Sequence, residues 1–328
     1  MTESLRWGLL STARINRRLI PAIRAAERAE LVAVASRDQA RAEAYATEWE
    51  IPRALGSYEA MLDDPDIDAV YVSLPNRLHA EWTVRAAQAG KHVLCEKPLA
   101  LSIAECDQIM AAAEEGGVVV AEAVMYLYHP LLHKAQKLIK AGALGQVTLA
   151  RGSFSFFLDR LTDVRWKPEL GGGSLWDVGS YPVSFIRWVA GEPDEVFGWQ
   201  TLTGSGVDAT FTGLLRYDNG VLGVFDSGFR QQFRIHAEVT GTEGALIVEQ
   251  PFPITPESRI VIQRGFDEEI ITVPGPDAYQ CEVDAVVAAA LDSVTLPVPL
   301  DLSRANVATL LALYESARSG EPQPVPET

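Results

Sequence analysis

Three side chains in this sequence have the chemistry to exchange protons with a hydroxyl group: Lys97, Asp177 and Tyr181. Asp177 and Tyr181 are four residues apart, so a helix over residues 176–189 would place them on one face. A carboxylate accepts hydrogen bonds from hydroxyl groups, and a phenol relays a proton when a nearby cation lowers its pKa. With Lys97 as that cation, the set predicts acid–base chemistry on a hydroxylated substrate.

Each of the three residues also has a purely structural interpretation. Lys97 would then be a surface lysine ahead of a helix, Asp177 a carboxylate at the positive end of a helix dipole, and Tyr181 a half-buried aromatic residue. The elements that position the three side chains must decide between these interpretations.

Apolar strands and amphipathic helices alternate through the first 122 residues. The predicted strands cover residues 5–10, 31–35, 69–74, 92–95 and 118–121. This alternation is typical of βαβ units, which build a parallel sheet with helices on both faces. The sequence therefore predicts an α/β fold that opens with a doubly wound, Rossmann-type dinucleotide-binding domain over residues 1–122. Lys97 follows the fourth strand, at the carboxyl edge where ligands of such folds bind.

The turn after the first strand is the predicted phosphate-binding segment. Its residues are Gly8, Ser11, Thr12, Ala13, Arg14 and Ile15. Such turns are usually glycine-rich and direct backbone N–H groups at a pyrophosphate. Here Ser11 and Ala13 stand in glycine positions, and the hydroxyl groups of Ser11 and Thr12 are additional donors for phosphate oxygens. A strand–helix turn that binds nothing is the alternative, and the turn alone leaves both open.

The end of the second strand favours NADP over NAD. NAD enzymes usually carry an acidic residue there for the ribose 2′-hydroxyl group. This sequence has Ser36 and Arg37, with Arg41 one turn further on, and these side chains suit a 2′-phosphate. Asp38 leaves NAD open, because its carboxylate is able to accept the 2′-hydroxyl.

A loop follows the third strand as Leu74-Pro75-Asn76, and we expect it to cover the ribose and nicotinamide. His79 lies in the next helix, where a structural role is more expected than a catalytic one.

The second part of the chain, residues 123–328, is predicted to be an α+β domain that binds substrate. Its predicted strands cover residues 146–156, 195–201, 209–217, 221–229, 234–241, 245–249 and 258–264. Short turns such as Asp218-Asn219-Gly220 join several of them, which indicates a mainly antiparallel sheet. Gly171-Gly172-Gly173 precedes Asp177 and lets the backbone pass close to a bulky neighbour.

Composition excludes several classes of partner. The formal net charge is −16, from 28 Lys and Arg against 44 Asp and Glu, and it repels nucleic acids and anionic membranes. A small neutral substrate fits better. Three cysteines with no metal-binding or disulfide spacing indicate a cytoplasmic setting and no metal site. We expect neither a signal peptide nor a membrane span, because no apolar run is long enough.

Taken together, these motifs resemble the glucose–fructose oxidoreductase / inositol 2-dehydrogenase family, known as Gfo/Idh/MocA. The segments that carry the resemblance are Gly8…Ala13, Pro75-Asn76…His79, Glu96-Lys97-Pro98, Glu122-Ala123-Val124-Met125-Tyr126…His129-Pro130 and Gly171-Gly172-Gly173…Asp177…Tyr181. The tyrosine at position 181 looks like the branch of NADP-dependent aldose 1-dehydrogenases and dihydrodiol dehydrogenases.

The resemblance implies roles for individual residues. Lys97 would bind substrate and cofactor, Asp177 would orient the reacting carbon, and Tyr181 would be the general acid/base. His79, Glu96 and Glu122 would join the cofactor site. The implied substrate-binding residues are Tyr126, Tyr128, Arg165 and Trp166, together with Asp177 and Tyr181.

The family also implies a homodimer or homotetramer formed through an open-faced C-terminal sheet. The expected activity is NADP-dependent hydride transfer at a sugar or polyol carbon. The alternatives are an NADPH-dependent keto-sugar or anhydro-sugar reductase, a non-catalytic NADP-binding regulatory protein, and a hydrolase that uses the cofactor transiently.

Overall fold

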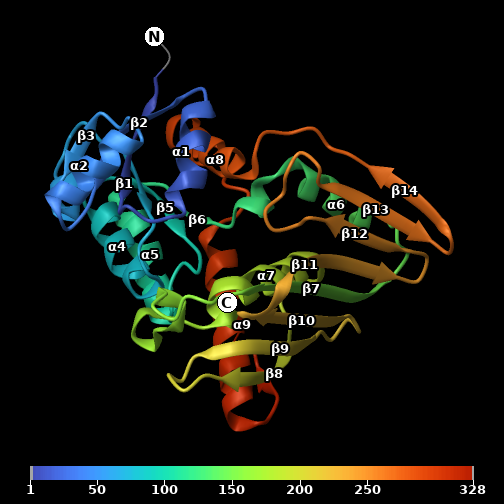
Figure 1. Cartoon of the computed structure of the whole chain (residues 1–328). Helices are drawn as coiled ribbons and strands as arrows, with labels where there is room; N and C mark the ends of the chain where they lie inside the picture. The colour runs from blue at the N-terminus through green and yellow to red at the C-terminus, as the bar shows by residue number, and fades with distance from the viewer. Residues whose placement is uncertain (1–2, 327–328) are drawn as a thin grey trace. The chain divides into compact units, whose positions relative to one another are not determined.

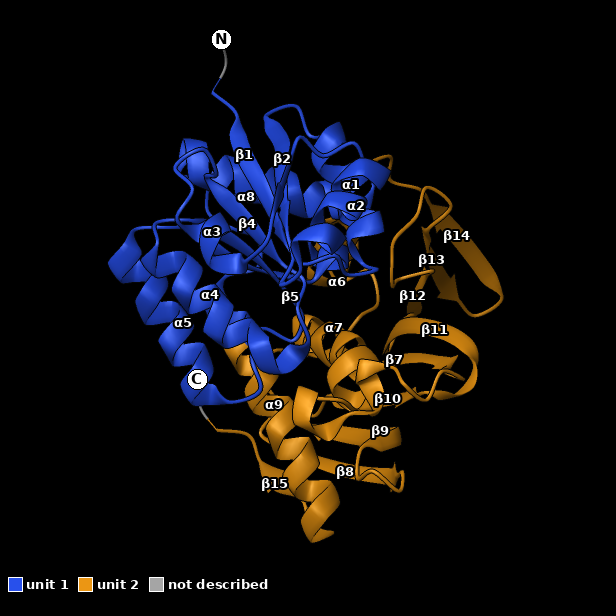
Figure 2. Ribbon diagram, turned by 60° about the vertical axis from the view of Figure 1, so that its left-hand side comes forward, with its two compact units in different colours: residues 1–128, 276–303 blue, residues 129–275, 304–328 orange. Residues whose placement is uncertain are grey.

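The computed structural model describes residues 3–326 and divides into two compact units. Unit 1 comprises residues 1–128 and 276–303, and unit 2 comprises residues 129–275 and 304–328; Figure 2 colours them separately. The sequence assigned residues 123–328 to one domain. The segment 276–303 instead packs with the first unit, because helix α8 (Ala278–Asp292) contacts helix α1 (Asn16–Ala25).

Unit 1 is built on a six-stranded sheet in the order β3-β2-β1-β4-β5-β6, in which every pairing is parallel. Its strands are β1 (Leu5–Leu10), β2 (Ala29–Ala35), β3 (Arg53–Leu55), β4 (Ala69–Val72), β5 (His92–Glu96) and β6 (Val120–Ala123). Its other helices are α2 (Gln39–Glu48), α3 (Tyr58–Leu62), η1 (Asn76–Leu78), α4 (His79–Gln88), α5 (Ile103–Gly116) and η2 (Met125–Tyr128). The predicted doubly wound domain is confirmed, with helices flanking the sheet (Figure 1).

Local sequence explains where the helices of unit 1 begin and end. The Ser102 hydroxyl accepts a hydrogen bond from Glu105 N at the start of α5, and Gly117 ends that helix in the left-handed conformation. The sheet core is apolar, and Trp7, Leu9 and Val70 are completely buried. Strand β3 and helix α3 were not predicted, since a three-residue strand gives too short a pattern.

Unit 2 is built on a nine-stranded sheet in the order β14-β13-β12-β11-β7-β10-β9-β8-β15. The strands are β7 (Val147–Phe157), β8 (Glu195–Leu202), β9 (Asp208–Arg216), β10 (Leu222–Gly228), β11 (Arg230–Gly241), β12 (Ala245–Glu249), β13 (Arg259–Arg264), β14 (Asp267–Ile271) and β15 (Gln323–Pro324). Within this second sheet, β10 and β7 are the only strands of the described residues that pair in parallel, so the predicted mainly antiparallel sheet is confirmed.

Helices cover one face of this second sheet. They include α6 (Pro130–Lys140), α7 (Ser180–Ala190) and α9 (Leu300–Ser319), and the short turns are η3 (Val164–Trp166), η4 (Pro168–Leu170) and η5 (Leu175–Gly179). Helix α7 contacts β7, β10 and β11, and the Ser316 hydroxyl of α9 accepts a hydrogen bond from Gly198 N at 3.0 Å. The burial of β9 alternates, with Phe211 and Leu215 inside and Leu214 outside, as a sheet with one covered face requires.

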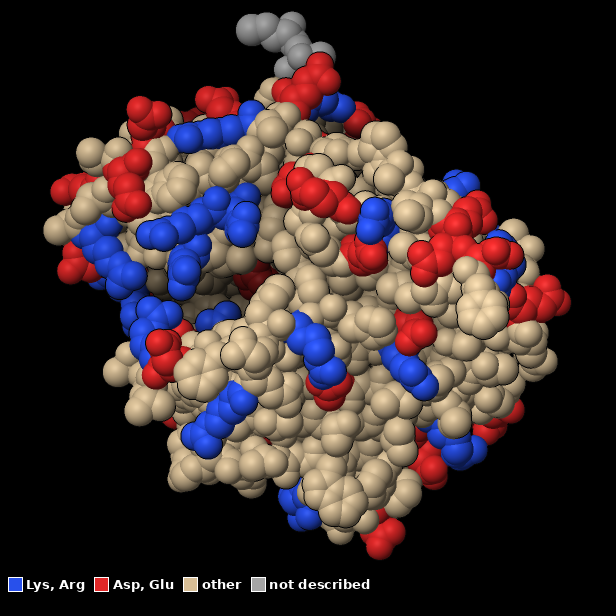
Figure 3. Space-filling model, turned by 45° about the vertical axis from the view of Figure 1, so that its right-hand side comes forward, with Lys and Arg blue, Asp and Glu red and all other residues tan. Residues whose placement is uncertain are grey.

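No helix among residues 3–326 combines the length and apolar character that a membrane span requires. Acidic and basic side chains lie interspersed on the face shown in Figure 3, between areas that carry neither. The excess of acidic residues is therefore not gathered into one patch on that face.

Candidate active site

The turn between β1 and α1 is held together by its own side chains. Ser11 has a φ of 147°, a conformation that favours glycine. Its hydroxyl lies 2.9 Å from Ser73 O and 2.8 Å from the Ser73 hydroxyl, and it accepts a hydrogen bond from Ala13 N at 3.1 Å. The Ser11 hydroxyl thus points into the fold, where we had expected a phosphate donor. Thr12 and Ala13 are half-buried and Arg14 is exposed, so this segment presents mainly its backbone.

Two further residues shape this turn. Asn16, which the sequence reasoning did not select, is fully buried and donates from Nδ2 to Ser11 O at 2.8 Å. Ile15 stands just before it, as the N-cap residue of α1. Gly8 lies inside β1, and a Cβ there would come within 2.5 Å of Met61 Sδ. Gly8 therefore makes room for the packing of α3.

Two exposed arginines follow β2, with Arg37 in the loop after the strand and Arg41 in the first turn of helix α2. Burial raises the pKa of the Tyr58 phenol, and the charges of Arg37 and Arg41 oppose that rise, so both charges act near the Tyr58 hydroxyl. Asp38 caps helix α2, since its Oδ1 accepts a hydrogen bond from Arg41 N at 2.9 Å. Ser36 is buried and accepts from Asp38 N at 3.3 Å. The acid that follows this strand, Asp38, is therefore engaged as a helix cap.

The segment that carries Lys97 is fixed on both sides. Before Lys97, Tyr71 donates its hydroxyl hydrogen to Glu96. After it, Leu99 N donates to Glu122 Oε1 at 2.8 Å. Lys97 itself is half-buried at the end of β5. Glu96 and Glu122, both predicted in the cofactor site, thus hold the lysine-bearing loop in unit 1.

His79 ties two loops of unit 1 together. Its Nδ1 lies 2.7 Å from Pro98 O, and its Nε2 lies 2.8 Å from Leu74 O. Burial lowers the pKa of His79, and Lys97 adds to that effect while the two carbonyl contacts oppose it. Leu74 is buried, while Pro75 and Asn76 are half-buried beside it. Both ring nitrogens are engaged with the backbone, which agrees with a structural role.

Glu282 in α8 is a second residue that the sequence reasoning missed. Its side chain is completely buried, and neither carboxylate oxygen has a hydrogen-bond partner in the structure. Burial raises the pKa of Glu282 well above its usual value, and the neighbouring Glu96 raises it further. A buried acid inside a helix had no motif to signal it.

Asp177 lies in η5, which is a π-helical turn, and Tyr181 lies in the α-helix that follows. The sequence predicted one α-helix over both. Pro182 has no backbone N–H group and cannot donate to Val178 O, so the regular hydrogen-bond pattern is interrupted there. Arg165 Nε donates to Asp177 Oδ2 at 2.5 Å, and Arg165 Nη1 lies 3.2 Å from Asp163 Oδ1. The negative charge of Asp177 raises the pKa of Arg165 despite burial.

Tyr181 packs among aromatic rings of unit 2. Its ring centroid lies 5.4 Å from that of Phe154 and 5.5 Å from that of Phe252, and the side chain is 8% exposed. The environment of the ring is apolar, and packing against two aromatic neighbours restricts the positions open to the phenol.

Like Tyr181, the other three predicted substrate-binding aromatic residues are buried. Trp166 belongs to a hydrophobic cluster with Phe229 and Val178. The Tyr128 hydroxyl donates to Glu122 O at 2.9 Å, and Tyr126 is fully buried. Trp166 and Tyr128 are therefore engaged in packing and hydrogen bonding within their own units.

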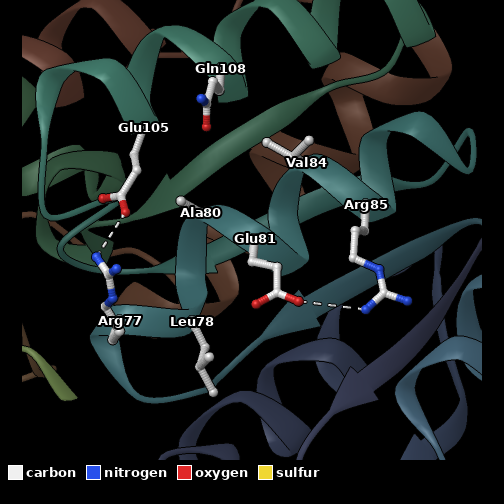
Figure 4. Close-up of a pocket in the computed structure, with 8 residues that line it drawn as sticks. All are labelled: Arg77, Leu78, Ala80, Glu81, Val84, Arg85, Glu105 and Gln108. Atoms are coloured by element: carbon white, nitrogen blue, oxygen red, sulfur yellow. Dashed lines mark hydrogen bonds and ion pairs between the residues drawn. The ribbon is translucent and has the colours of Figure 1, made fainter. Parts of the chain in front are cut away.

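A surface groove of unit 1 contains none of the predicted site residues. It runs between α4 and α5, and ion pairs from Arg77 to Glu105 and from Arg85 to Glu81 border it (Figure 4). Residues 3–326 hold no group of three or more His, Cys, Asp or Glu side chains suited to a metal ion.

Comparison with known proteins agrees with this architecture. Residues 5–124 match the family model described as "Oxidoreductase family, NAD-binding Rossmann fold", and residues 132–247 match the "GFO/IDH/MocA C-terminal domain". The chain belongs to the Gfo/Idh/MocA oxidoreductase family. This membership confirms the resemblance that the sequence motifs indicated, and with it an oxidoreductase with a Rossmann domain.

Individual members of the family are similar over nearly the whole chain. A D-xylose 1-dehydrogenase (NADP(+)) from Haloferax volcanii is 41% identical over 319 residues, which cover 96% of this chain and 98% of the relative. The structure of an aldose-aldose oxidoreductase from Caulobacter crescentus, complexed with glycerol, has a TM-score of 0.91 and 26% identity, with 98% of this chain and 100% of that chain covered. A 3-ketoreductase from Actinomadura kijaniata, complexed with NADP and TDP-benzene, has a TM-score of 0.89 and 29% identity, with 96% and 98% covered.

Proposed function

We propose that this protein oxidises a neutral sugar or polyol and uses NADP as the hydride acceptor. The observation that carries the proposal is the identity to an NADP-dependent D-xylose 1-dehydrogenase over almost the full length of both chains. Aldoses of that type are uncharged, which suits a chain with a formal net charge of −16.

The cofactor preference is supported at the end of β2. Asp38 Oδ1 accepts the hydrogen bond that caps α2, so one of the two carboxylate oxygens is already engaged and is not offered to a ribose 2′-hydroxyl group. Arg37 and Arg41 are exposed and close enough to act on the same phenol, Tyr58, so they suit a 2′-phosphate. We propose that the backbone of residues 11–15 and the loop 74–76 complete the dinucleotide site.

We propose the following roles for the three residues in the reaction. Tyr181 exchanges the proton of the reacting hydroxyl group, Asp177 accepts hydrogen bonds from the substrate, and Lys97 stabilises negative charge on oxygen. NADP, when bound, supplies the carbon that accepts the hydride. The Arg165–Asp177 ion pair supports the assignment, because the guanidinium group limits the rotation of the Asp177 carboxylate.

The proposal is tested by a fluorescence titration with NADPH and NADH, followed by a screen of aldoses, ketoses and polyols. We expect tighter binding of NADPH and NADPH formation from at least one aldose. Equal affinity for both cofactors would refute the NADP assignment, and the absence of turnover on every sugar would favour a non-catalytic regulatory protein.

A keto-sugar reductase is the second candidate function. Its support is the TM-score of 0.89 to a 3-ketoreductase whose structure holds NADP. The same screen separates the two functions, because a reductase would consume NADPH with a keto-sugar faster than it would form NADPH from an aldose.

We further propose a homodimer or homotetramer formed through the uncovered face of the unit 2 sheet. Trp199, Leu214 and Leu222 are 66%, 52% and 52% exposed. The register places Leu214 beside Phe197 and Val224, so the apolar side chains are contiguous over β8, β9 and β10. A cytoplasmic location is supported by Cys95, Cys106 and Cys281, none of which forms a disulfide.

A further inference from the structure

Asp208, at the start of β9, is an unusual residue because it is an acid with only 1% of its surface exposed. Its carboxylate accepts three hydrogen bonds. Ser174 Oγ donates to Oδ2 at 2.7 Å, Leu175 N donates to the same oxygen at 2.8 Å, and Tyr314 Oη donates to Oδ1 at 2.7 Å. A buried carboxylate is costly unless it is satisfied in this way.

Two of these donors belong to the turn that carries Asp177. Leu175 is the first residue of the π-helical turn η5, and Ser174 stands immediately before it. Backbone N–H groups at a helix start have no partner within the helix, and a carboxylate is their strongest acceptor. The turn continues when Asp177 N donates to Gly173 O at 3.2 Å. Asp208 therefore holds the backbone at Leu175, two residues before Asp177.

Gly173 explains how the acid reaches the turn. It has a φ of +123°, and a Cβ there would lie 2.2 Å from Asp208 Oδ1 and 2.8 Å from Tyr314 Oη. The bulky neighbour that the glycine run predicted is thus the chain itself. Any side chain at position 173 would separate the carboxylate from the turn.

We infer that Asp208 is a positioning residue, which holds η5 so that Asp177 keeps its place opposite Arg165. The inference rests on the proposed function, because it gives Asp177 a role in the reaction. Asp177 is tethered on one side by Arg165, and Asp208 fixes the backbone from which it projects. A displacement of about 1 Å in a reacting group is enough to lower turnover by about 100-fold.

The test compares Asp208→Ala, Ser174→Ala and Asp208→Asn in the full-length protein. Asp208→Asn keeps the shape: its Oδ1 accepts from Ser174 and Leu175, and its amide donates to a rotated Tyr314 hydroxyl. We expect Asp208→Ala and Ser174→Ala to lower kcat at least tenfold while the Kd for NADPH changes less than twofold. Asp208→Asn should restore most of the activity.

Leu215→Ala is the control for a general loss of stability. It creates a cavity at a fully buried side chain of the same strand, and the leucine side chain makes no hydrogen bond to η5. This variant should lose thermal stability but keep kcat per folded molecule. A folded Asp208→Ala or Ser174→Ala enzyme with a kcat within twofold of wild type would overturn the inference.

Hydrogen exchange of residues 174–179 provides a readout that does not need turnover. We expect these amides to exchange at least tenfold faster in Asp208→Ala and at the wild-type rate in Leu215→Ala. Unchanged exchange rates of these amides in Asp208→Ala would refute the role of Asp208 in holding η5, even if activity fell. If these amides exchanged faster in Asp208→Ala but the wild type oxidised no sugar, the role of Asp208 in holding η5 would be supported and the proposed function refuted.

Discussion

Arg165 Nε donates to Asp177 Oδ2 at 2.5 Å, and this contact joins a predicted substrate-binding residue to a predicted catalytic one. Asp163 supports the pair from the other side of the guanidinium group, because its Oδ1 lies 3.2 Å from Arg165 Nη1. The ion pair with Arg165 thereby orients the carboxylate of Asp177.

Replacing Arg165 by Ala should lower kcat/KM for the sugar by about 10- to 100-fold, because Asp177 loses the partner that orients it. The affinity for NADPH should stay within twofold of wild type. Steady-state kinetics and a cofactor titration measure both quantities. Arg160→Ala is the matched control, since Arg160 also contacts Asp163 but has no hydrogen bond to Asp177 among those found. Equal losses in the two variants would contradict a specific role of the Arg165–Asp177 pair.

Replacing Arg37 by Ala should weaken NADPH binding by about 10- to 100-fold, the effect of one lost charge-assisted hydrogen bond. NADH binding should change by less than twofold, because NADH has no 2′-phosphate. Arg85→Ala, at a half-buried arginine of α4 in the same unit, serves as control. If Arg37→Ala weakened both cofactors equally, the NADP assignment at β2 would be wrong.

Glu282→Gln should stabilise the protein at alkaline pH. Burial raises the pKa of Glu282 above its usual value of 4.5, so between the unfolded and folded pKa values the folded state binds more protons than the unfolded state. The free energy of unfolding of the wild type therefore falls as pH rises through that window, by about 1.4 kcal/mol per pH unit. Glutamine has no charge to bury and escapes this loss.

Thermal melts of wild type and Glu282→Gln from pH 5 to pH 9 measure the effect. The difference in Tm should grow with pH in favour of the variant. The exposed Glu115→Gln should show no such trend. A constant difference across the range would mean that Glu282 is already ionised in the folded protein.

Leu214→Asp should convert the proposed oligomer to monomers, because it places a charge in the centre of the exposed apolar surface on β8, β9 and β10. Sedimentation velocity or light scattering reports the mass. Leu161→Asp, at a residue that is 78% exposed outside the sheet, should leave the assembly unchanged. A wild-type protein that sediments as a monomer would exclude the proposed interface.

The sequence predicted the two sheets, because both leave a regular pattern of apolar residues and turns along the chain. The alternation of apolar strands and helices predicted the parallel sheet of unit 1, and short turns such as the one at Asn219 predicted the antiparallel sheet of unit 2. Strand β14 was missed because four of its five residues are exposed, three of them acidic. The sequence did not predict that α8 belongs to unit 1. The helix packs against α1, which is far away in the sequence, and such a contact leaves no local pattern.

The candidate site was predictable only in its residue types. Motif spacing selected Asp177 and Arg165, but the π-helical turn between Ser174 and Ser180 depends on Pro182 and on a distant acid, Asp208. The inward rotation of the Ser11 hydroxyl depends on Ser73, which is 62 residues away. Contacts of this kind arise from tertiary packing, and a single sequence does not encode them as a periodic pattern.

The central claim is that Lys97 and Tyr181 act on the same proton-transfer step of an NADP-dependent sugar oxidation. The most direct measurement is kcat for NADPH formation by wild type, Lys97→Met, Tyr181→Phe and the double variant, with NADPH affinity measured in parallel. We predict that each single change lowers kcat by about 100- to 10,000-fold. The kcat of the double variant should be only slightly below that of the less active single variant. Near-normal turnover in either single variant, or fully multiplicative losses in the double variant, would contradict the account.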